Sequence, residues 1–296
     1  MHLMNEDLMR KIRAFRASVW RHYRVHGRHD LAWRNTKDPY RILVSEVMLQ
    51  QTQVPRVIEK YQEFLKAFPT VHTLAQAPLV DVLHVWSGMG YNRRAKFLRE
   101  AASILVGEYG GRVPRDAPAL RAIPGIGPYT ASAVRVFAFN LPDTMIETNI
   151  RAAFIHHFFA DTDGVNYSSK LPNWVKRSSS EDVRIRKGIK DSDLLPLITT
   201  AAEGQDPREW HWALMDYGSH IKKLHGNPAR QSAHYAKQSK FEGSLRQVRG
   251  AILRALSQGT PLLKVRRLSP EKFDEALAGL ARDGLIIKRR GKWGIA

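Results

Sequence analysis

The stretch Leu120–Ala131 reads LRAIPGIGPYTA and carries the strongest structural signal in the chain. A short apolar helix ends before Pro124, and a second helix begins directly after Gly127. The intervening turn presents free backbone N–H groups and a helix N-terminus, both of which favour an anion such as a DNA phosphate. A plain turn between two helices would need the same glycines for backbone geometry alone. The Leu-x-x-Ile-Pro before the turn and the apolar helix after it favour a helix-hairpin-helix motif, in which Gly125, Gly127 and Thr130 contact DNA.

Helical periodicity continues on both sides of this motif. The segment Asn5–Tyr23 carries Leu8, Ile12, Phe15 and Val19 at the spacing of one helix face. Further helical patterns cover residues 39–54, 57–67, 79–86, 92–109, 118–122, 130–139, 193–203 and 207–223. Alternating strand patterns are scarce in this region, so we expect an all-α architecture of short helices joined by Gly/Pro turns.

The composition indicates a folded protein with a polyanionic partner. The 296 residues fit about two domains, and 43% apolar residues exclude a disordered polycation. The formal net charge of +19 attracts nucleic acid or an anionic membrane surface. Charged residues interrupt every apolar run before the roughly 18 residues that a membrane helix needs. We therefore expect a cytoplasmic, nucleoid-associated protein with no membrane partner, and a monomer by default.

Cysteine is absent from the chain. This absence excludes a cysteine nucleophile, a disulfide framework, a thiolate zinc site and an all-cysteine iron–sulfur cluster. Histidines near residues 225 and 234 lie among cations and are more typical of exposed or DNA-facing side chains than of metal ligands. We expect neither a metal nor another cofactor.

Two domains are predicted, over residues 1–242 and 243–296. The first contains a polar, basic insertion at about 161–193 and ends in a basic connector. The second shows helices at Leu245–Leu256 and Pro270–Asp283, then two short strands around a turn at Arg290-Gly291. This order predicts a winged-helix-like module, and Lys240–Ala296 carries a net charge of +8. The excess charge is consistent with DNA contact or with a solvated face on a packing domain.

The first candidate for chemistry is Glu46, an acidic residue in an otherwise apolar helical pattern. Burial raises the pKa of a carboxyl group, as a general acid working near neutral pH requires. An exposed helix carboxylate is the alternative for a lone glutamate. Against that alternative, four polar residues suited to base-edge or base-stack contacts follow closely: Gln50, Gln51, Thr52 and Gln53.

The second candidate is Glu147, which precedes Thr148 and Asn149 shortly after the hairpin helix. It is suited to cap a helix that begins near Asn149. Its other possible role is to face a developing cation, as carboxylates do when glycosyl bonds break through an oxocarbenium-like state. One acid with a raised pKa and one ionised carboxylate are the minimum equipment for that reaction.

Several short motifs in a fixed order resemble one known family. They are LAWR at 31–34, DPY at 38–40, SEVMLQQTQV at 45–54, GMGY at 88–91, the hairpin at 120–131 and the helix at 210–218. This set looks like the MutY-type adenine DNA glycosylases of the helix-hairpin-helix superfamily. The run at 45–54 is the most specific part, because broader relatives such as endonuclease III and the thymine-mismatch glycosylases share the hairpin but not that run.

The resemblance implies roles for individual residues. Glu46 matches the general acid that protonates adenine and then activates water. Gln51 matches a residue that wedges into the base stack, and Tyr91 an aromatic residue working beside it to extrude the nucleotide. Tyr129 falls where bifunctional lyase relatives keep a lysine, so a monofunctional glycosylase is implied. Glu147, with Asn149 nearby, would stabilise the sugar cation.

Three departures separate the chain from the family pattern. Glu147 stands where the family has aspartate, which moves the carboxylate by about 1.5 Å. The family's four-cysteine iron–sulfur cluster is replaced after residue 218 by cationic and polar residues, so this segment must be held by hydrogen bonds, packing and ion pairs. The family's larger C-terminal domain, which reads the oxidised guanine, does not fit within residues 243–296.

The predicted protein is a base-excision repair glycosylase that removes adenine mispaired with guanine or 8-oxoguanine from double-stranded DNA. A thymine or uracil mismatch glycosylase would share the chemistry and differ in its pocket. A non-catalytic DNA-binding protein on the same fold is the third possibility, supported by Glu147 and by the missing cluster.

Overall fold

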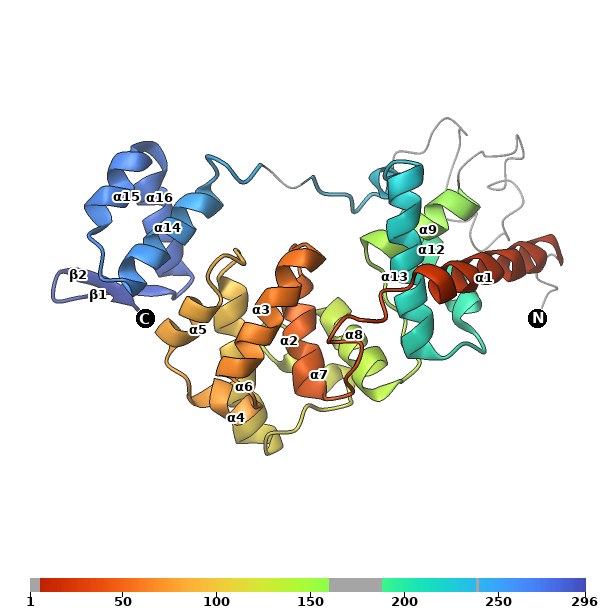
Figure 1. Ribbon diagram of the computed structural model, residues 1–296, viewed down its shortest axis with the longest axis horizontal. Helices are drawn as coiled ribbons and strands as arrows, with labels where there is room; N and C mark the ends of the chain where they lie inside the picture. The colour runs from red at the N-terminus through yellow and green to blue at the C-terminus, as the bar shows by residue number, and fades with distance from the viewer. Residues whose placement is uncertain (1–5, 160–187, 238–239) are drawn as a thin grey trace. The chain divides into compact units, whose positions relative to one another are not determined.

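The computed structural model describes residues 6–159, 188–237 and 240–296 and is mainly helical (Figure 1). The predicted insertion at 161–193 lies outside the described residues up to position 187. The chain divides into two compact units, one of residues 1–30 and 135–237, the other of residues 31–134 and 238–296. The predicted division into 1–242 and 243–296 stays a prediction. No helix in the described ranges is long and apolar enough to cross a membrane.

The unit of residues 31–134 and 238–296 contains the hairpin. Its first stretch holds α2 (Pro39–Leu49), α3 (Val54–Ala67), α4 (Val71–Gln76), α5 (Leu79–Val85), α6 (Arg93–Tyr109), α7 (Ala117–Ala122) and the start of α8 (Pro128–Phe139). Buried apolar side chains fill its centre, among them Phe64, Leu74, Trp86 and Leu98. The turn between α7 and α8 confirms the predicted helix-hairpin-helix motif.

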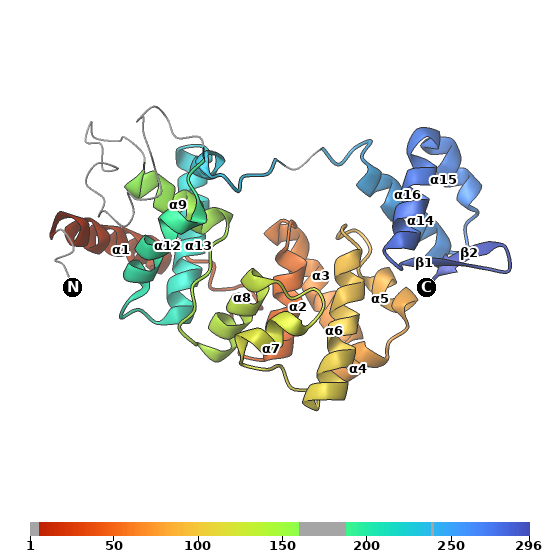
Figure 2. The same ribbon diagram turned by 180° about the vertical axis from the view of Figure 1, so that it is seen from behind.

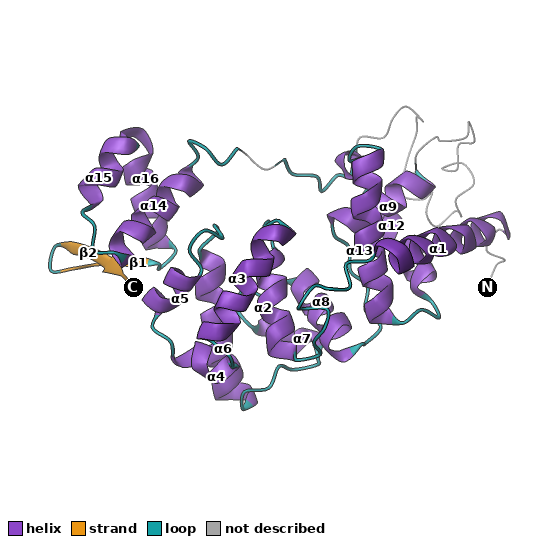
Figure 3. Ribbon diagram, viewed as in Figure 1, coloured by secondary structure: helices purple, strands orange, loops and turns teal. Residues whose placement is uncertain are grey.

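The second stretch of this unit has the predicted winged-helix-like order. It contains α14 (Leu245–Ser257), α15 (Leu262–Leu268), α16 (Pro270–Arg282), β1 (Ile286–Arg289) and β2 (Lys292–Ile295). Within the described residues the two antiparallel strands form the only sheet (Figure 3). Arg290 and Gly291 both have positive φ, 48° and 80°, as a two-residue turn between twisted strands requires. The short helix α15 has no counterpart in the sequence prediction.

The other unit contains α1 (Glu6–His26), the end of α8, α9 (Thr148–Phe158), α12 (Asp191–Ala202), α13 (Pro207–Leu224) and the 3-10 helix η1 (Pro228–Gln231). Helices α9 and α13 lie side by side, as Figures 1 and 2 both show. Phe15 of α1 packs against Phe154, Phe158 and Trp210, with ring centroids 4.8, 5.4 and 6.3 Å away. This aromatic cluster joins helices that are far apart in sequence.

The helix predicted over 39–54 is too long, because α2 ends at Leu49. Gln50 leaves the helical conformation with ψ 112°, and Gln51 has a left-handed φ of 55°. Helix α3 begins at Val54, which places Pro55 in the first turn, where a proline costs no hydrogen bond. Residues 50–53 therefore form a loop between two helices. The prediction also missed α4, whose capping box joins Thr70 and Thr73.

Candidate functional site

Helix α2 places Glu46 in the interior of its unit. Asp38 is the N-cap of this helix, because its side chain accepts hydrogen bonds from the backbone N–H groups of Tyr40 and Arg41, and Pro39 occupies the first turn. Glu46 is 5% exposed, and the neighbouring Ser45 donates its hydroxyl to the Ile42 carbonyl oxygen at 2.8 Å. The alternative of an exposed helix carboxylate is therefore wrong for Glu46.

The loop after α2 and the loop before α6 each contain a residue in the left-handed region. These residues are Gln51, with φ 55°, and Tyr91, with φ 48°. Neither is a glycine, so each conformation carries a cost of about 1 kcal/mol that the surroundings must outweigh. Gln51 is exposed at the loop tip, whereas Tyr91 is partly buried. Such strain is concentrated at functional sites, and it falls here on the two residues predicted to enter the base stack.

A buried arginine that the sequence analysis missed holds these two loops together. Arg94 is 8% exposed and lies in the first turn of α6. Its guanidinium donates to five backbone carbonyl oxygens and one hydroxyl: those of Val47 (2.8 Å), Met48 (2.9 Å), Gln50 (2.6 Å), Met89 (3.1 Å), Gly90 (3.1 Å) and Thr52 (Oγ1, 3.0 Å). Burial lowers the pKa of Arg94 to about 10, so the group stays charged at neutral pH. In the sequence, Arg93-Arg94 is indistinguishable from a solvated basic pair.

The hairpin connects to the same loops. Gln50 Nε2 donates to the Thr130 hydroxyl at 3.1 Å, and Thr130 is only 2% exposed. The structure thus places Thr130 as a support for Gln50. Gly125 has φ 81°, and a Cβ at this position would lie 2.6 Å from Cβ of Phe97. Only glycine satisfies both constraints, whereas Gly127 has open space around it.

Four of the predicted DNA-contacting residues line one cavity of about 540 Å³: Gln50, Gln51, Tyr91 and Gly125. Thr52 does not line this cavity and accepts a hydrogen bond from Arg94 at 3.0 Å. Tyr129 is partly buried at the start of α8. The structure therefore gathers the loop residues, the aromatic residue and the hairpin turn into one surface region of this unit.

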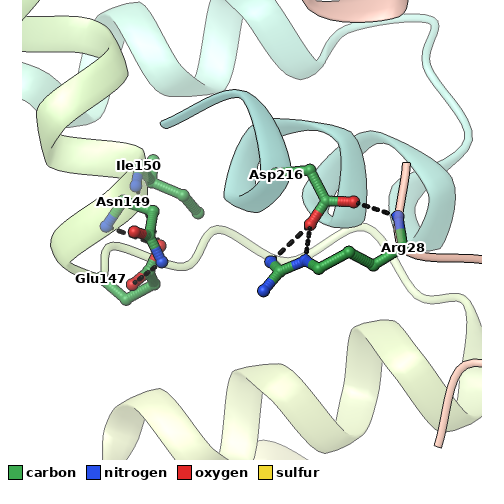
Figure 4. Close-up of polar contacts among 5 residues, drawn as sticks. All are labelled: Arg28, Glu147, Asn149, Ile150 and Asp216. Atoms are coloured by element: carbon green, nitrogen blue, oxygen red, sulfur yellow. Dashed lines mark hydrogen bonds and ion pairs between the residues drawn. The ribbon is translucent and has the colours of Figure 1, made fainter. Parts of the chain in front are cut away.

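Glu147 caps α9 in the other unit. Its Oε1 accepts the backbone N–H groups of Asn149 and Ile150 at 2.8 and 2.9 Å, and Oε2 accepts Asn149 Nδ2 at 3.1 Å (Figure 4). Burial raises the pKa of Glu147, and the hydrogen bonds from Asn149 and Ile150 oppose that rise. The capping role expected from the sequence is confirmed. A role toward a sugar cation stays a prediction.

The same unit contains an ion pair whose carboxylate is buried. Asp216 of α13 accepts the backbone N–H of Arg28 at 2.9 Å and its Nε at 2.6 Å (Figure 4). The Asp216 side chain is 2% exposed, so the backbone and side-chain hydrogen bonds from Arg28 offset the cost of burying its charge. This pair fixes the segment after α1 against the helix that the sequence analysis matched to the family.

The segment after α13 does not fit a four-cysteine cluster, since the chain contains no cysteine. Among the residues that the structure describes, no three His, Asp or Glu side chains gather as metal ligands. A backbone bridge holds the segment, in which Ser232 pairs with Ile189 in parallel. Next to this bridge, Arg151 of α9 donates to both carboxylate oxygens of Asp191 at 2.7 Å and fixes the start of α12. His234 Nε2 lies 4.0 Å from the same carboxylate. Backbone hydrogen bonding thus holds the segment, as the sequence predicts, and its predicted ion pairs stay a prediction.

Comparisons with known proteins identify the family of the chain. The model of the HhH-GPD superfamily base excision DNA repair proteins matches residues 44–192. The adenine DNA glycosylase of Mycobacterium tuberculosis is 42% identical over 272 residues, covering 88% of this chain and 86% of that protein. The adenine DNA glycosylase of Buchnera aphidicola is 39% identical over 157 residues, covering 53% of this chain but only 44% of that protein.

One solved structure shares the fold over most of the chain. It is described as a thermostable thymine-DNA glycosylase, with a TM-score of 0.56 and 27% identity. The match covers 71% of this chain and 87% of that one. Since the family model spans half of the sequence and a relative matched over 86% of its length is 42% identical, the chain belongs to the HhH-GPD superfamily of base excision DNA repair proteins.

Proposed function

We propose that this protein is a monofunctional DNA glycosylase that acts as a monomer on double-stranded DNA and hydrolyses the N-glycosidic bond of adenine opposite guanine or 8-oxoguanine. The observation that carries the proposal is the buried carboxyl group of Glu46 on a helix that leads directly into the strained loop of Gln51. The relative from Mycobacterium tuberculosis, named an adenine DNA glycosylase, supports adenine as the substrate base.

In the proposed reaction, the DNA is first opened. Gln51 and Tyr91 enter the base stack, because the glycosidic bond of a paired base cannot be reached inside the duplex. The exposed turn at Gly125 and Gly127 binds a backbone phosphate through main-chain N–H groups and the start of α8. Arg94 keeps both loops in their strained conformations during this step.

Glu46 then acts as the general acid. It donates a proton to the adenine ring, so that the base leaves as a neutral molecule and the bonding electron pair departs with it. A water molecule then adds to the sugar cation and gives up a proton to the Glu46 carboxylate, which completes the hydrolysis and restores the acid. Tyr129 offers no amine for a Schiff base, which makes strand cleavage by a lyase step unavailable at this position. Glu147 and Asn149 are the candidates for stabilising the cation.

The test is single-turnover release of base from duplexes that contain adenine opposite 8-oxoguanine, guanine or cytosine. Glu46→Gln keeps the shape of the side chain and removes the acidic proton, so we expect adenine release to fall by at least about 100-fold. Glu59→Gln, on the exposed side of α3, is the matched control and should leave release unchanged. Equal release by wild type and Glu46→Gln would refute the assignment of the acid.

A second candidate function has its own support. The solved structure that shares the fold is described as a thymine-DNA glycosylase, so duplexes with thymine or uracil opposite guanine belong in the same assay. Release of the pyrimidine without release of adenine would establish this alternative. Tight binding of every duplex with no release of any base would establish a non-catalytic DNA-binding protein.

A further inference from the structure

Helix α14 of the winged-helix-like module brings a cation to the loop that carries Tyr91. Arg246 Nη1 donates to the Tyr91 hydroxyl at 2.8 Å, and its guanidinium carbon lies 5.1 Å from the centre of the Tyr91 ring. The first contact fixes the guanidinium at the hydroxyl end of the tyrosine, and the second places it over the face of the ring. Arg246 is separated from Tyr91 by 155 residues of sequence and reaches it through the tertiary structure.

Arg246 also forms one wall of the 540 Å³ cavity described above. Gln50, Gln51 and Gly125 line the same cavity, and Arg249, one turn further along α14, lines it as well. The volume is in the range of sites that bind small organic molecules, and it is ample for one nucleobase. Amide groups, an aromatic ring and a guanidinium fork match the hydrogen-bonding edge and the flat face of a base.

The two arginines of α14 have different surroundings. Arg249 donates to the carboxylate of Asp283, which also lies 3.6 Å from Arg93 Nε. Lys96 Nζ donates to the Asp283 backbone carbonyl at 3.1 Å. This network anchors the module to α6 through Asp283. Arg246, one turn earlier, is directed to the aromatic ring beside the strained loop.

We propose that Arg246 is a specificity-determining residue for the base left unpaired opposite the excised nucleotide, with its guanidinium donating to the O6 and N7 acceptors of a guanine. This inference rests on the proposed function, because Gln51 and Tyr91 enter the stack beside that base. The winged-helix-like module thereby contributes directly to substrate selection. Bidentate donation from arginine is the commonest specific contact to guanine.

The test measures binding of duplexes that contain a stable abasic-site analogue opposite guanine, cytosine or thymine, for wild type and Arg246→Ala. No base release is needed for this measurement. We expect wild type to prefer guanine and the variant to lose about 5- to 150-fold of that preference. Arg254→Ala is the matched control, since Arg254 is exposed on the same helix and does not line this cavity. Arg246→Lys retains the charge without the planar fork, so it should restore affinity more than preference.

Two results would overturn the proposal. Weaker binding by Arg246→Ala that is equal for all three opposing bases, with a salt-dependence slope reduced by about one, would show a phosphate contact. Unchanged binding and preference in a folded variant would show that the contact with Tyr91 only packs the module. A wild type that prefers guanine through Arg246 but releases no adenine would disprove the proposed reaction and leave this inference standing. Adenine release by a wild type that has no preference for guanine would support the proposed reaction and disprove the inference about Arg246.

Discussion

Arg94 Nη1 lies 2.6 Å from the backbone carbonyl oxygen of Gln50, the C-cap residue that directly follows α2. The same guanidinium reaches the carbonyl oxygen of Gly90 at 3.1 Å, next to Tyr91. One buried side chain thus satisfies backbone groups of both loops that carry the left-handed residues. Unsatisfied buried carbonyl groups are costly, so the arginine makes the strained conformations possible.

The first prediction concerns this arrangement. Arg94→Lys retains a positive charge but has three donors for six acceptors. Its ammonium group also lacks the planar geometry by which the guanidinium contacts both loops. We expect base release to fall about 10- to 100-fold, because misplacing the loops by about 1 Å is enough for such a loss. The free energy of unfolding should fall on the order of 3 kcal/mol. Urea denaturation and single-turnover assays measure the two effects.

Arg93→Lys is the control for Arg94→Lys. Arg93 is the preceding residue, its side chain is 55% exposed, and it contacts the partly buried carboxylate of Asp283 and the ring of Phe97. We expect a change in stability below about 1 kcal/mol and little change in base release. If both lysine variants behave alike, the buried contacts of Arg94 do not control the loops.

Glu147 allows structural and chemical roles to be separated. Glu147→Ala removes the acceptor of two backbone N–H groups and should lower stability by about 1 kcal/mol. Glu147→Gln keeps an oxygen acceptor and loses the negative charge. We expect the free energy of unfolding of Glu147→Gln to lie no more than about 0.5 kcal/mol below that of Glu147→Ala, or above it. Base release by Glu147→Gln should be slower by at least about tenfold, since a neutral amide stabilises a cation poorly. Full base-release activity in Glu147→Gln would leave the side chain with its capping role alone.

Local signals made part of the architecture predictable. Asp38 and Pro39 encode the start of α2 within two residues. Arg290 and Gly291 encode the turn between β1 and β2 in the same way. The glycines of the hairpin likewise predict their own turn. These elements follow from short-range backbone preferences, so a single sequence contains enough information to place them.

Other features depend on tertiary contacts and were out of reach. Glutamine is a good helix former, so the run after Leu49 continued the predicted helix until Val54. Its actual loop depends on Arg94, a residue 44 positions away from Gln50. The position of Arg246 beside Tyr91 has the same origin. Neither arginine differs in sequence context from the many exposed cations of this basic chain.

His157, whose ring lies 5.1 Å from that of Phe15, predicts a pH-dependent stability. His157 Nε2 lies 2.8 Å from the Tyr217 hydroxyl. Burial, with the charges of His156, Lys11 and His225, lowers the pKa of His157 to about 4. The unfolded chain binds a proton near the ordinary value of 6.5, so between pH 6.5 and 4 the unfolded state carries more protons, and stability falls as the pH is lowered through this range.

Through His157, the free energy of unfolding should be about 2 kcal/mol lower at pH 5 than at pH 8. His157→Asn cannot titrate in this range and should have a shallower pH dependence, although it is less stable at pH 8. Urea denaturation of both proteins at several pH values gives the comparison. Parallel curves for wild type and variant would assign the pH dependence to other groups.

Gly218 of α13 faces the backbone of α9 at the point where Asn149 lies. A Cβ at this position would clash with the Asn149 carbonyl oxygen, and main-chain atoms have no rotamer by which to move away. Gly218→Ala must therefore push α9 and α13 apart, and we expect the free energy of unfolding to fall by about 1–3 kcal/mol or more. Because Asn149 donates to Glu147, base release should fall as well.

Gly107→Ala is the matched control for Gly218→Ala. Gly107 also lies within a helix, α6, but it is exposed, and a methyl group added there would have no neighbouring atom within 4 Å. Alanine is the better helix former, so this variant should gain about 0.5–1 kcal/mol and keep its base-release activity. Thermal denaturation of the two variants beside wild type measures the contrast. A Gly218→Ala protein as stable as wild type would mean that α9 and α13 do not pack this closely in solution.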